Sequence, residues 1–181
     1  TVTGVDENII DGNQKSTITI TIVDSISDND FSAVADQTVT ATTTDDDVAG
    51  FTIAETDGST EVAESGTTDT FTVVLDAQPA SDVVLTITSS DTGEATVTST
   101  VTFTDANWDT PQTVTVTGVD DNLVDGNIDS TITITVDDAN SNDDFDAVAD
   151  QTVTTTTTDD DDAGFTVVES GGSTSVDESG T

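Results

Sequence analysis

Valine and isoleucine alternate with threonine along much of this 181-residue chain. The pattern is clearest in TITITI (17–22), FTVVLD (71–76) and TVTVTGV (113–119), where apolar side chains fall on one face and threonines on the other. This two-residue period is typical of half-buried β-strands, and both Val and Thr favour strands. No stretch shows a helical period, so the chain is predicted to be all-β.

The same pattern returns 114 residues later. Residues 1–67 align without a gap on residues 115–181, and 47 of these 67 positions are identical. A period of this length is a typical single-domain size. We therefore expect the end of one repeat (strands E–G) at 1–46, one complete repeat at 47–161 and the start of the next at 162–181, as a window on a longer tandem array.

Within the complete repeat, seven strands are predicted between turn sequences rich in Gly, Asp, Asn and Pro. Their expected ranges are 50–55, 70–76, 82–88, 94–104, 113–119, 130–137 and 152–158. Seven short strands within one period predict an antiparallel β-sandwich of immunoglobulin type.

Charge adds a strongly acidic surface to this sandwich. The chain has 38 acidic residues, one basic residue, no histidine and no cysteine, for a net charge of −37. This charge argues against nucleic acid and anionic membranes as partners, and no apolar run has the length of a membrane span. The chain offers little for catalysis and is not expected to be an enzyme, so cations are the expected partners.

The acidic residues converge when they are placed on such a sandwich. Alternate loops lie at the same end, so the A–B, C–D and E–F loops share one pole with the end of the last strand. The acids expected at this pole are Glu64, Asp91, Asp120, Asp121, Asp125, Asp159, Asp160 and Asp161. Their counterparts in the partial first copy are Asp6, Glu7, Asp11, Asp45, Asp46 and Asp47.

Oxygen ligands from four separate segments predict a Ca²⁺ site, because Ca²⁺ takes six to eight oxygens and needs neither His nor Cys. Mg²⁺ fits less well, since it keeps its waters and requires octahedral geometry. The EF-hand pattern is not met, because DDNLVDG has one residue too many before its glycine. The alternative interpretation is a solvated acidic surface.

The chain resembles the Calx-β domain family in an ordered set of motifs. These are AGFTIAETDGSTEVAESGT (49–67), VTFTDANWDTPQTVTV (101–116), GVDDNLVDGN (118–127) and the terminal DDD (159–161). The family includes domains of sodium–calcium exchangers, of integrin β4 and of tandem arrays in giant bacterial surface proteins. The resemblance implies calcium ligands at Glu64, Asp120, Asp121, Asp125 and Asp159–Asp161. The family's Asp-Tyr pair has no match here, and Asp91 is the nearest counterpart.

These features favour a structural function. We expect a segment of a secreted, calcium-binding surface adhesin or filament, as in a biofilm, with Ca²⁺ stiffening the junctions between adjacent repeats. One alternative is a calcium-sensing regulatory module. Another is a polymer whose copies complete the partial repeats by donating strands. Near-identical copies favour the structural function over the sensor, because a spacer needs many copies.

Three features concern the opposite pole. Trp108, the only tryptophan, is expected to cover one end of the core. The acidic D–E loop (105–109) and F–G loop (142–147) are expected at the pole that faces the preceding repeat. They either complete a junction site or are simply solvated.

Overall fold

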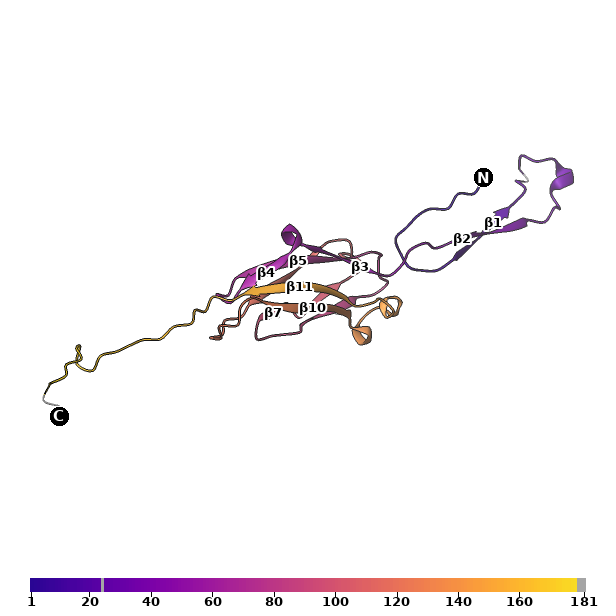
Figure 1. The fold of residues 1–181 in the computed structure, drawn as a ribbon. Helices are drawn as coiled ribbons and strands as arrows, with labels where there is room; N and C mark the ends of the chain where they lie inside the picture. Colours follow the sequence, from indigo (N-terminus) through magenta and orange to yellow (C-terminus); the bar gives the residue numbers. More distant parts are fainter. Residues whose placement is uncertain (24, 179–181) are drawn as a thin grey trace.

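The computed structural model describes residues 1–23 and 25–178 and shows an elongated chain (Figure 1). A β-sandwich formed by residues 51–158 lies in the middle. A two-stranded hairpin from the partial first copy extends from one pole, and the C-terminal segment leaves from the other. The polypeptide therefore enters and leaves the complete repeat at opposite poles, as a tandem array requires.

The sandwich consists of two sheets, with strand orders β4–β11–β10–β6–β8 and β3–β5–β9–β7. The strands of the first sheet are, in that order, Thr60–Ala63, Gln151–Thr158, Ile128–Val136, Val83–Ser89 and Thr100–Phe103. Those of the second sheet are Phe51–Glu55, Thr68–Leu75, Gln112–Gly118 and Ala95–Val97. The all-β sandwich predicted from the alternation is confirmed.

The alternation of the sequence becomes the two faces of each strand. In β10, every second residue from Ser130 to Val136 is buried, while the threonines between them are exposed or half-buried. One of these, Thr133, pairs with Thr152 of β11 on one side and Thr88 of β6 on the other. Such cross-strand pairs stabilise the sheet on its outer face.

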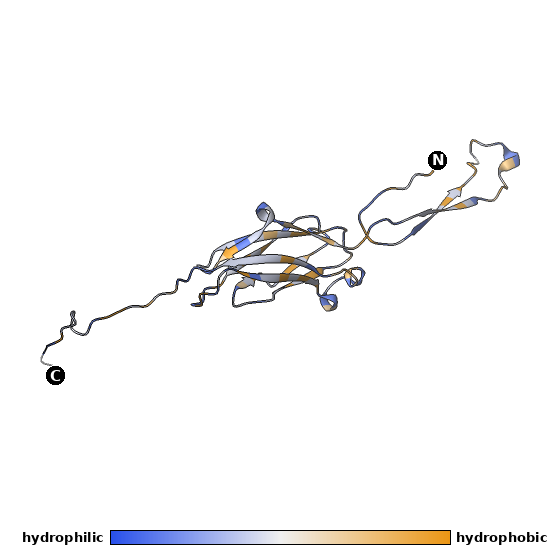
Figure 2. Cartoon of the chain, viewed as in Figure 1, coloured by the Kyte–Doolittle hydropathy of each residue, from blue (hydrophilic) through white to orange (hydrophobic). Residues whose placement is uncertain are grey.

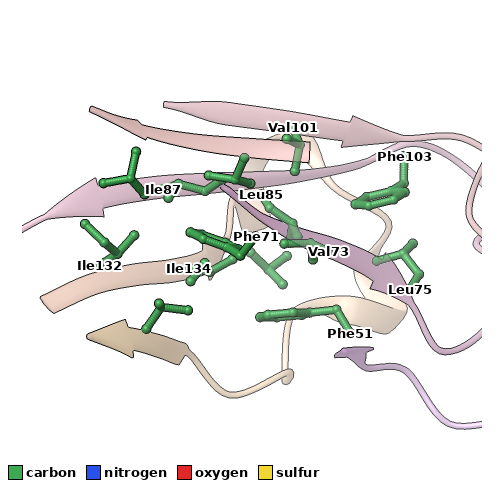
Figure 3. Packing of buried hydrophobic residues seen from close by; sticks show 14 of the residues in the cluster. Phe51, Phe71, Val73, Leu75, Leu85, Ile87, Val101, Phe103, Ile132 and Ile134 are labelled. Carbon is green, nitrogen blue, oxygen red and sulfur yellow. The ribbon is translucent and has the colours of Figure 1, made fainter. Parts of the chain in front are cut away.

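The core lies between the two sheets (Figure 3). Phe71, Phe103 and Phe145 have no exposed surface and are its largest fully buried side chains. Burying a side chain of this size stabilises the fold by roughly 1.5–3 kcal/mol. Trp108 is partly buried and packs against this core, as predicted. The carbonyl oxygen of Trp108 also accepts a hydrogen bond from the N–H of Leu75 at 3.1 Å.

Short 3-10 turns connect several strands. They span Asn29–Phe31, Thr56–Gly58, Asp138–Asn140 and Asp143–Phe145. No helix in the described part of the chain is long and apolar enough to cross a membrane.

The strand pattern differs from the prediction in two places. Residues 60–63 form β4, which pairs in parallel with β11, so one parallel pair joins the antiparallel ones. The stretch 94–104 divides into β7 and β8, which lie in opposite sheets. The change of sheet falls between two neighbours: the N–H of Thr98 donates to the carbonyl oxygen of Thr115 in β9, while the carbonyl oxygen of Ser99 accepts from Ile87 in β6.

The partial first copy forms a hairpin of β1 (Gln14–Ile20) and β2 (Gln37–Thr43). Its register repeats that of β10 and β11, since Ile18 pairs with Val39 as Ile132 pairs with Val153. No second sheet covers its apolar positions (Figure 2), and Val39 is 52% exposed whereas Val153 is 4% exposed. A lone hairpin of this kind is marginally stable in water.

Residues 1–13 and 163–178 contain no strand in the part of the chain that the structure describes. Residues 115–118, the counterparts of 1–4, lie in β9 between β5 and β7. Among the described residues, no counterparts of β5 and β7 lie beside residues 1–4, and strand E, expected within 1–46, does not form there. Residues 179–181, at the end of the expected third repeat, lie outside the described residues. The repeat boundaries after residues 46 and 161 stay predictions.

Candidate metal centre

Glu64 lies where β4 ends against β11. Its backbone N–H donates to the carbonyl oxygen of Thr158 at 3.1 Å, which extends the pairing of β4 with β11 by one residue. Its side chain is only 1% exposed. The parallel pairing therefore places a buried carboxylate at the point where β11 runs into Asp159–Asp161.

The E–F loop (119–127, between β9 and β10) is tied to the end of β11 through Asp159. The N–H of Gly126 donates to Oδ2 of Asp159 at 2.7 Å, and the N–H of Asp161 donates to Oδ1 of the same carboxylate at 2.8 Å. Gly126 has a φ of 76°, a conformation that residues with a side chain rarely adopt. The loop and the linker that follows β11 therefore share one acceptor.

Three overlapping groups of carboxylates each bring three ligand atoms within 4.8 Å of one another. The groups are Glu64–Asp125–Asp159, Glu64–Asp121–Asp161 and Glu94–Asp121–Asp125. Two oxygens on one Ca²⁺ lie no more than about 5 Å apart, because each is 2.3–2.6 Å from the ion. These spacings suit Ca²⁺, and the residues shared between groups could bridge neighbouring ions.

Buried oxygens without partners distinguish this cluster from a solvated acidic surface. Among the described residues, Oε2 of Glu64, Oε2 of Glu94 and Oδ2 of Asp161 are buried and accept no hydrogen bond. Leaving a buried polar group unsatisfied costs about 1–3 kcal/mol, and more for a charged group. Cations bound at these groups would provide partners for such oxygens, with Glu64 and Asp161 in one group and Glu94 in another.

Burial also controls the protonation of the cluster. It raises the pKa values of Glu64, Glu94 and Asp161, and neighbouring carboxylates raise them further. The N–H of Asp160 partly opposes the rise in the pKa of Glu64 by hydrogen bonding to its carboxylate. Asp159 differs, because the hydrogen bonds from Asp161 and Gly126 lower its pKa. Protons and a bound cation would therefore compete for these carboxylates.

Asp91, Asp120 and Asp160 lie at the same pole but belong to none of the three groups. All three are exposed, and Oδ1 of Asp91 accepts the backbone N–H two residues further on at 2.9 Å. The charge of Asp91 helps to raise the pKa of Glu94, and that of Asp120 helps to raise the pKa of Asp161. These residues therefore add negative charge around the groups.

Glu94 is the candidate ligand that the sequence reasoning missed. It was expected as the first residue of a strand, but it ends the C–D loop (90–94, between β6 and β7) and is 7% exposed. Its carbonyl oxygen accepts the N–H of Val119 at 2.8 Å and the hydroxyl of Thr157 at 3.3 Å, which anchors it between the E–F loop and β11. The available signal was its position, three residues after Asp91 and directly before a strand that starts at the acidic pole.

The partial first copy repeats the loop geometry without completing the cluster. Oδ2 of Asp45 accepts the N–H of Gly12 at 2.7 Å, and Oδ1 accepts the N–H of Asp47 at 2.9 Å. These hydrogen bonds lower the pKa of Asp45, and burial raises the pKa of Asp47. The counterparts of Glu64 and Glu94 fall before residue 1. Within the described residues, no three-carboxylate group includes Asp6, Glu7, Asp11, Asp45, Asp46 or Asp47.

Comparison with known proteins leaves the family open. No protein-family model matches the chain, and no curated protein sequence matches it. The likeness to Calx-β domains therefore stays a resemblance of motifs.

Several solved structures share part of the fold. SSP-19, an MSP-domain-like protein of Caenorhabditis elegans, is 20% identical with a TM-score of 0.36, over 55% of this chain and 92% of that chain. Domains 4 and 5 of the S-layer protein SbsC are 25% identical with a TM-score of 0.41, over 68% of this chain and 53% of that chain. The E. coli chaperone DraB is 6% identical with a TM-score of 0.43, over 61% of this chain and 55% of that chain. At these TM-scores the likenesses carry no inference about function.

Proposed function

We propose that this chain is a structural segment of an extracellular tandem-repeat adhesin or filament, in which Ca²⁺ holds adjacent repeats in a fixed orientation. The observation that carries the proposal is Glu64, which is buried, has an unpartnered oxygen and belongs to two of the carboxylate groups. Each of these groups joins Glu64 to one acid of the E–F loop and one acid of the linker after β11.

An ion held in this way would connect the body of a repeat to its exit. Glu64, Asp121 and Asp125 belong to the sandwich and its loops, whereas Asp159 and Asp161 begin the segment that leads to the next repeat. In the first copy, only residues 44–50 separate the end of β2 from the start of β3. A linker this short has little freedom once its first residues are bound to a cation.

The remaining composition agrees with a non-enzymatic, extracellular role. The chain has neither histidine, the most frequent general acid–base residue, nor cysteine, an intrinsically strong nucleophile. Calcium sites of extracellular modules have dissociation constants of roughly 10⁻⁴–10⁻³ M, so weak sites fill outside cells. The near-identical copies favour a spacer over a sensor, because a sensor needs few tuned copies.

Glu64→Gln is expected to weaken Ca²⁺ binding by at least about ten-fold, equivalent to about 1.4 kcal/mol, because the substitution removes a carboxylate that two groups share. The same substitution is expected to raise the melting temperature in chelator, since it removes a buried charge whose pKa is raised by burial. Isothermal titration calorimetry and thermal melting on the 181-residue chain test both expectations.

Glu61→Gln is the matched control. Glu61 lies in β4, three residues before Glu64, and has the same side chain, but it is exposed and belongs to no carboxylate group. Equal losses of affinity in the two variants would mean that calcium is attracted to a diffuse acidic surface, and the proposed site would be wrong.

A further inference from the structure

The E–F loop of the first copy touches the complete repeat. The N–H of Gln78, in the turn between β5 and β6, donates to the carbonyl oxygen of Asn8 at 2.7 Å. Ile9 and Gln78 form an isolated parallel bridge. Ile10 is partly buried against the hydrophobic core of the complete repeat. Three consecutive residues of one repeat therefore contact the repeat that follows.

The turn that receives this loop is held in place by its own repeat. Ala77 and Pro79, on either side of Gln78, are buried. The side-chain Nε2 of Gln78 donates to the carbonyl oxygen of Asp105 at 2.9 Å, which joins the turn to the D–E loop. The surface is therefore formed by the complete repeat itself and does not depend on the preceding loop.

The linker that joins the first copy to the complete repeat (residues 44–50) also ends at the β5–β6 turn. The N–H of Asp76 donates to the carbonyl oxygen of Gly50 at 2.9 Å, and Oδ1 of Asp76 accepts the hydroxyl of Thr52 at 2.8 Å. A Cβ on Gly50 would lie only 2.5 Å from Oδ2 of Asp76, so the linker approaches this turn closely. The linker and the preceding E–F loop therefore converge on one short segment.

The same loop of the complete repeat presents an uncovered apolar pair. Leu123 and Val124 occupy the positions of Ile9 and Ile10 but are 62% and 58% exposed. They lie between two candidate cation ligands, and the N–H of Leu123 donates to Oδ1 of Asp121 at 2.6 Å. No β5–β6 turn of a following repeat lies in this chain, which accounts for their exposure.

We propose that this apolar pair is the docking element between repeats, and that its partner is the β5–β6 turn of the repeat that follows. Ile9 and Ile10 occupy that partner in this chain, and Leu123–Val124 would occupy the turn of a third repeat. The inference rests on the tandem-array part of the proposed function and not on calcium. Because the pair lies between acids that could bind cations, the loop that holds the ions is also the loop that touches the next repeat.

Hydrogen exchange at the Gln78 amide reports this contact directly, because that N–H is bonded to Asn8 across the junction. In the 181-residue chain, the Gln78 amide is expected to be protected. The Ile9→Ser/Ile10→Ser double variant is expected to lose this protection. The matched control is Leu123→Ser/Val124→Ser, which makes the same change in a loop without a partner and should leave Gln78 protected. The amides of Ile132 and Ile134 verify that the sandwich is folded in both variants.

Two results would overturn the docking contact. One is an unprotected Gln78 amide in the unmodified chain, and the other is equal protection in both double variants. A second measurement uses spin labels at Thr38→Cys and Ser99→Cys, which are unique because the chain has no cysteine. The Ile9→Ser/Ile10→Ser variant is expected to lose the single narrow distance peak, and the control variant is expected to keep it.

Calcium titration separates this inference from the proposed function. The Ile9→Ser/Ile10→Ser variant leaves the Glu64 groups intact, so its calcium affinity should equal that of the unmodified chain. If the Gln78 amide is protected but the chain binds no calcium, the calcium site is contradicted and the docking contact is not. Normal calcium binding with an unprotected Gln78 amide would contradict the docking contact alone.

Discussion

In calcium at neutral pH, the complete repeat is expected to melt about 10 °C higher than in excess chelator. An ion that binds only the folded state stabilises it by mass action, by about 2.7 kcal/mol when free calcium is 100 times the dissociation constant. For a domain of this size, each kcal/mol moves the melting temperature by roughly 4 °C. Differential scanning calorimetry of the 181-residue chain measures the difference.

Sodium chloride at matched ionic strength is the control for general screening. Salt screens exposed charges well but buried groups much less, and Glu64 and Glu94 are buried. Sodium chloride is therefore expected to reproduce only a small part of the calcium effect. An unchanged melting temperature in calcium, or an equal rise in sodium chloride, would favour the solvated acidic surface.

The pH dependence of stability is expected to change sign with calcium. In chelator, the melting temperature should rise as the pH falls from about 7 toward about 5. The raised pKa values of Glu64, Glu94 and Asp161 mean that the folded state binds protons more tightly than the unfolded chain. Their stabilising contribution is complete below their ordinary values of 4.5 for Glu and 3.8 for Asp, and it is lost as the pH rises through the raised values.

Asp159 contributes in the opposite direction but in a lower pH range. Its pKa is lowered, so its contribution is present above 3.8 and is lost only at more acidic pH. In saturating calcium, protons compete with the ion for the same oxygens. The melting temperature should therefore fall as the pH is lowered from about 7 to about 5. Thermal melts at several pH values in both buffers test this reversal, and the same slope in both buffers would contradict it.

The alternation of the sequence was sufficient to predict the sandwich because it is a local property. In TITITV of β10, the period of two decides which residues face the core, and Ile132 and Ile134 are fully buried. The acidic pole was predictable for a related reason, since alternate loops of a sandwich meet at one end. Glu64, Asp121, Asp125, Asp159 and Asp161 were brought together by that rule alone.

Features that depend on contacts between distant segments could not be predicted in this way. The four residues of β4 are too few to show a period, and they become a strand because the edge of β11 is available to pair with them. The stretch 94–104 keeps a period of two on both sides of Ser99, and this one polar residue at an apolar position is too weak a signal to predict a change of sheets between Thr98 and Ser99. Glu94 becomes buried through that arrangement, which brings its carbonyl oxygen to Thr157.

The contact between repeats could not be predicted from the sequence either. Ile9 and Ile10 lie in a loop whose acids indicate cation binding, and nothing local in the sequence indicates that Ile9 pairs with Gln78 or that Ile10 packs against the core of the complete repeat. The comparison of Ile9–Ile10 with Leu123–Val124 became informative once the structure gave their different exposures.

We propose that Ca²⁺ binds between the body of the repeat and its exit, with Glu64 as a shared ligand. Anomalous diffraction from crystals grown in calcium tests this most directly. At least one anomalous peak is expected at this pole, with oxygens of Glu64, of an E–F loop acid and of a linker acid at about 2.3–2.6 Å. Crystals in saturating calcium that show no peak within coordination distance of Glu64 would contradict it.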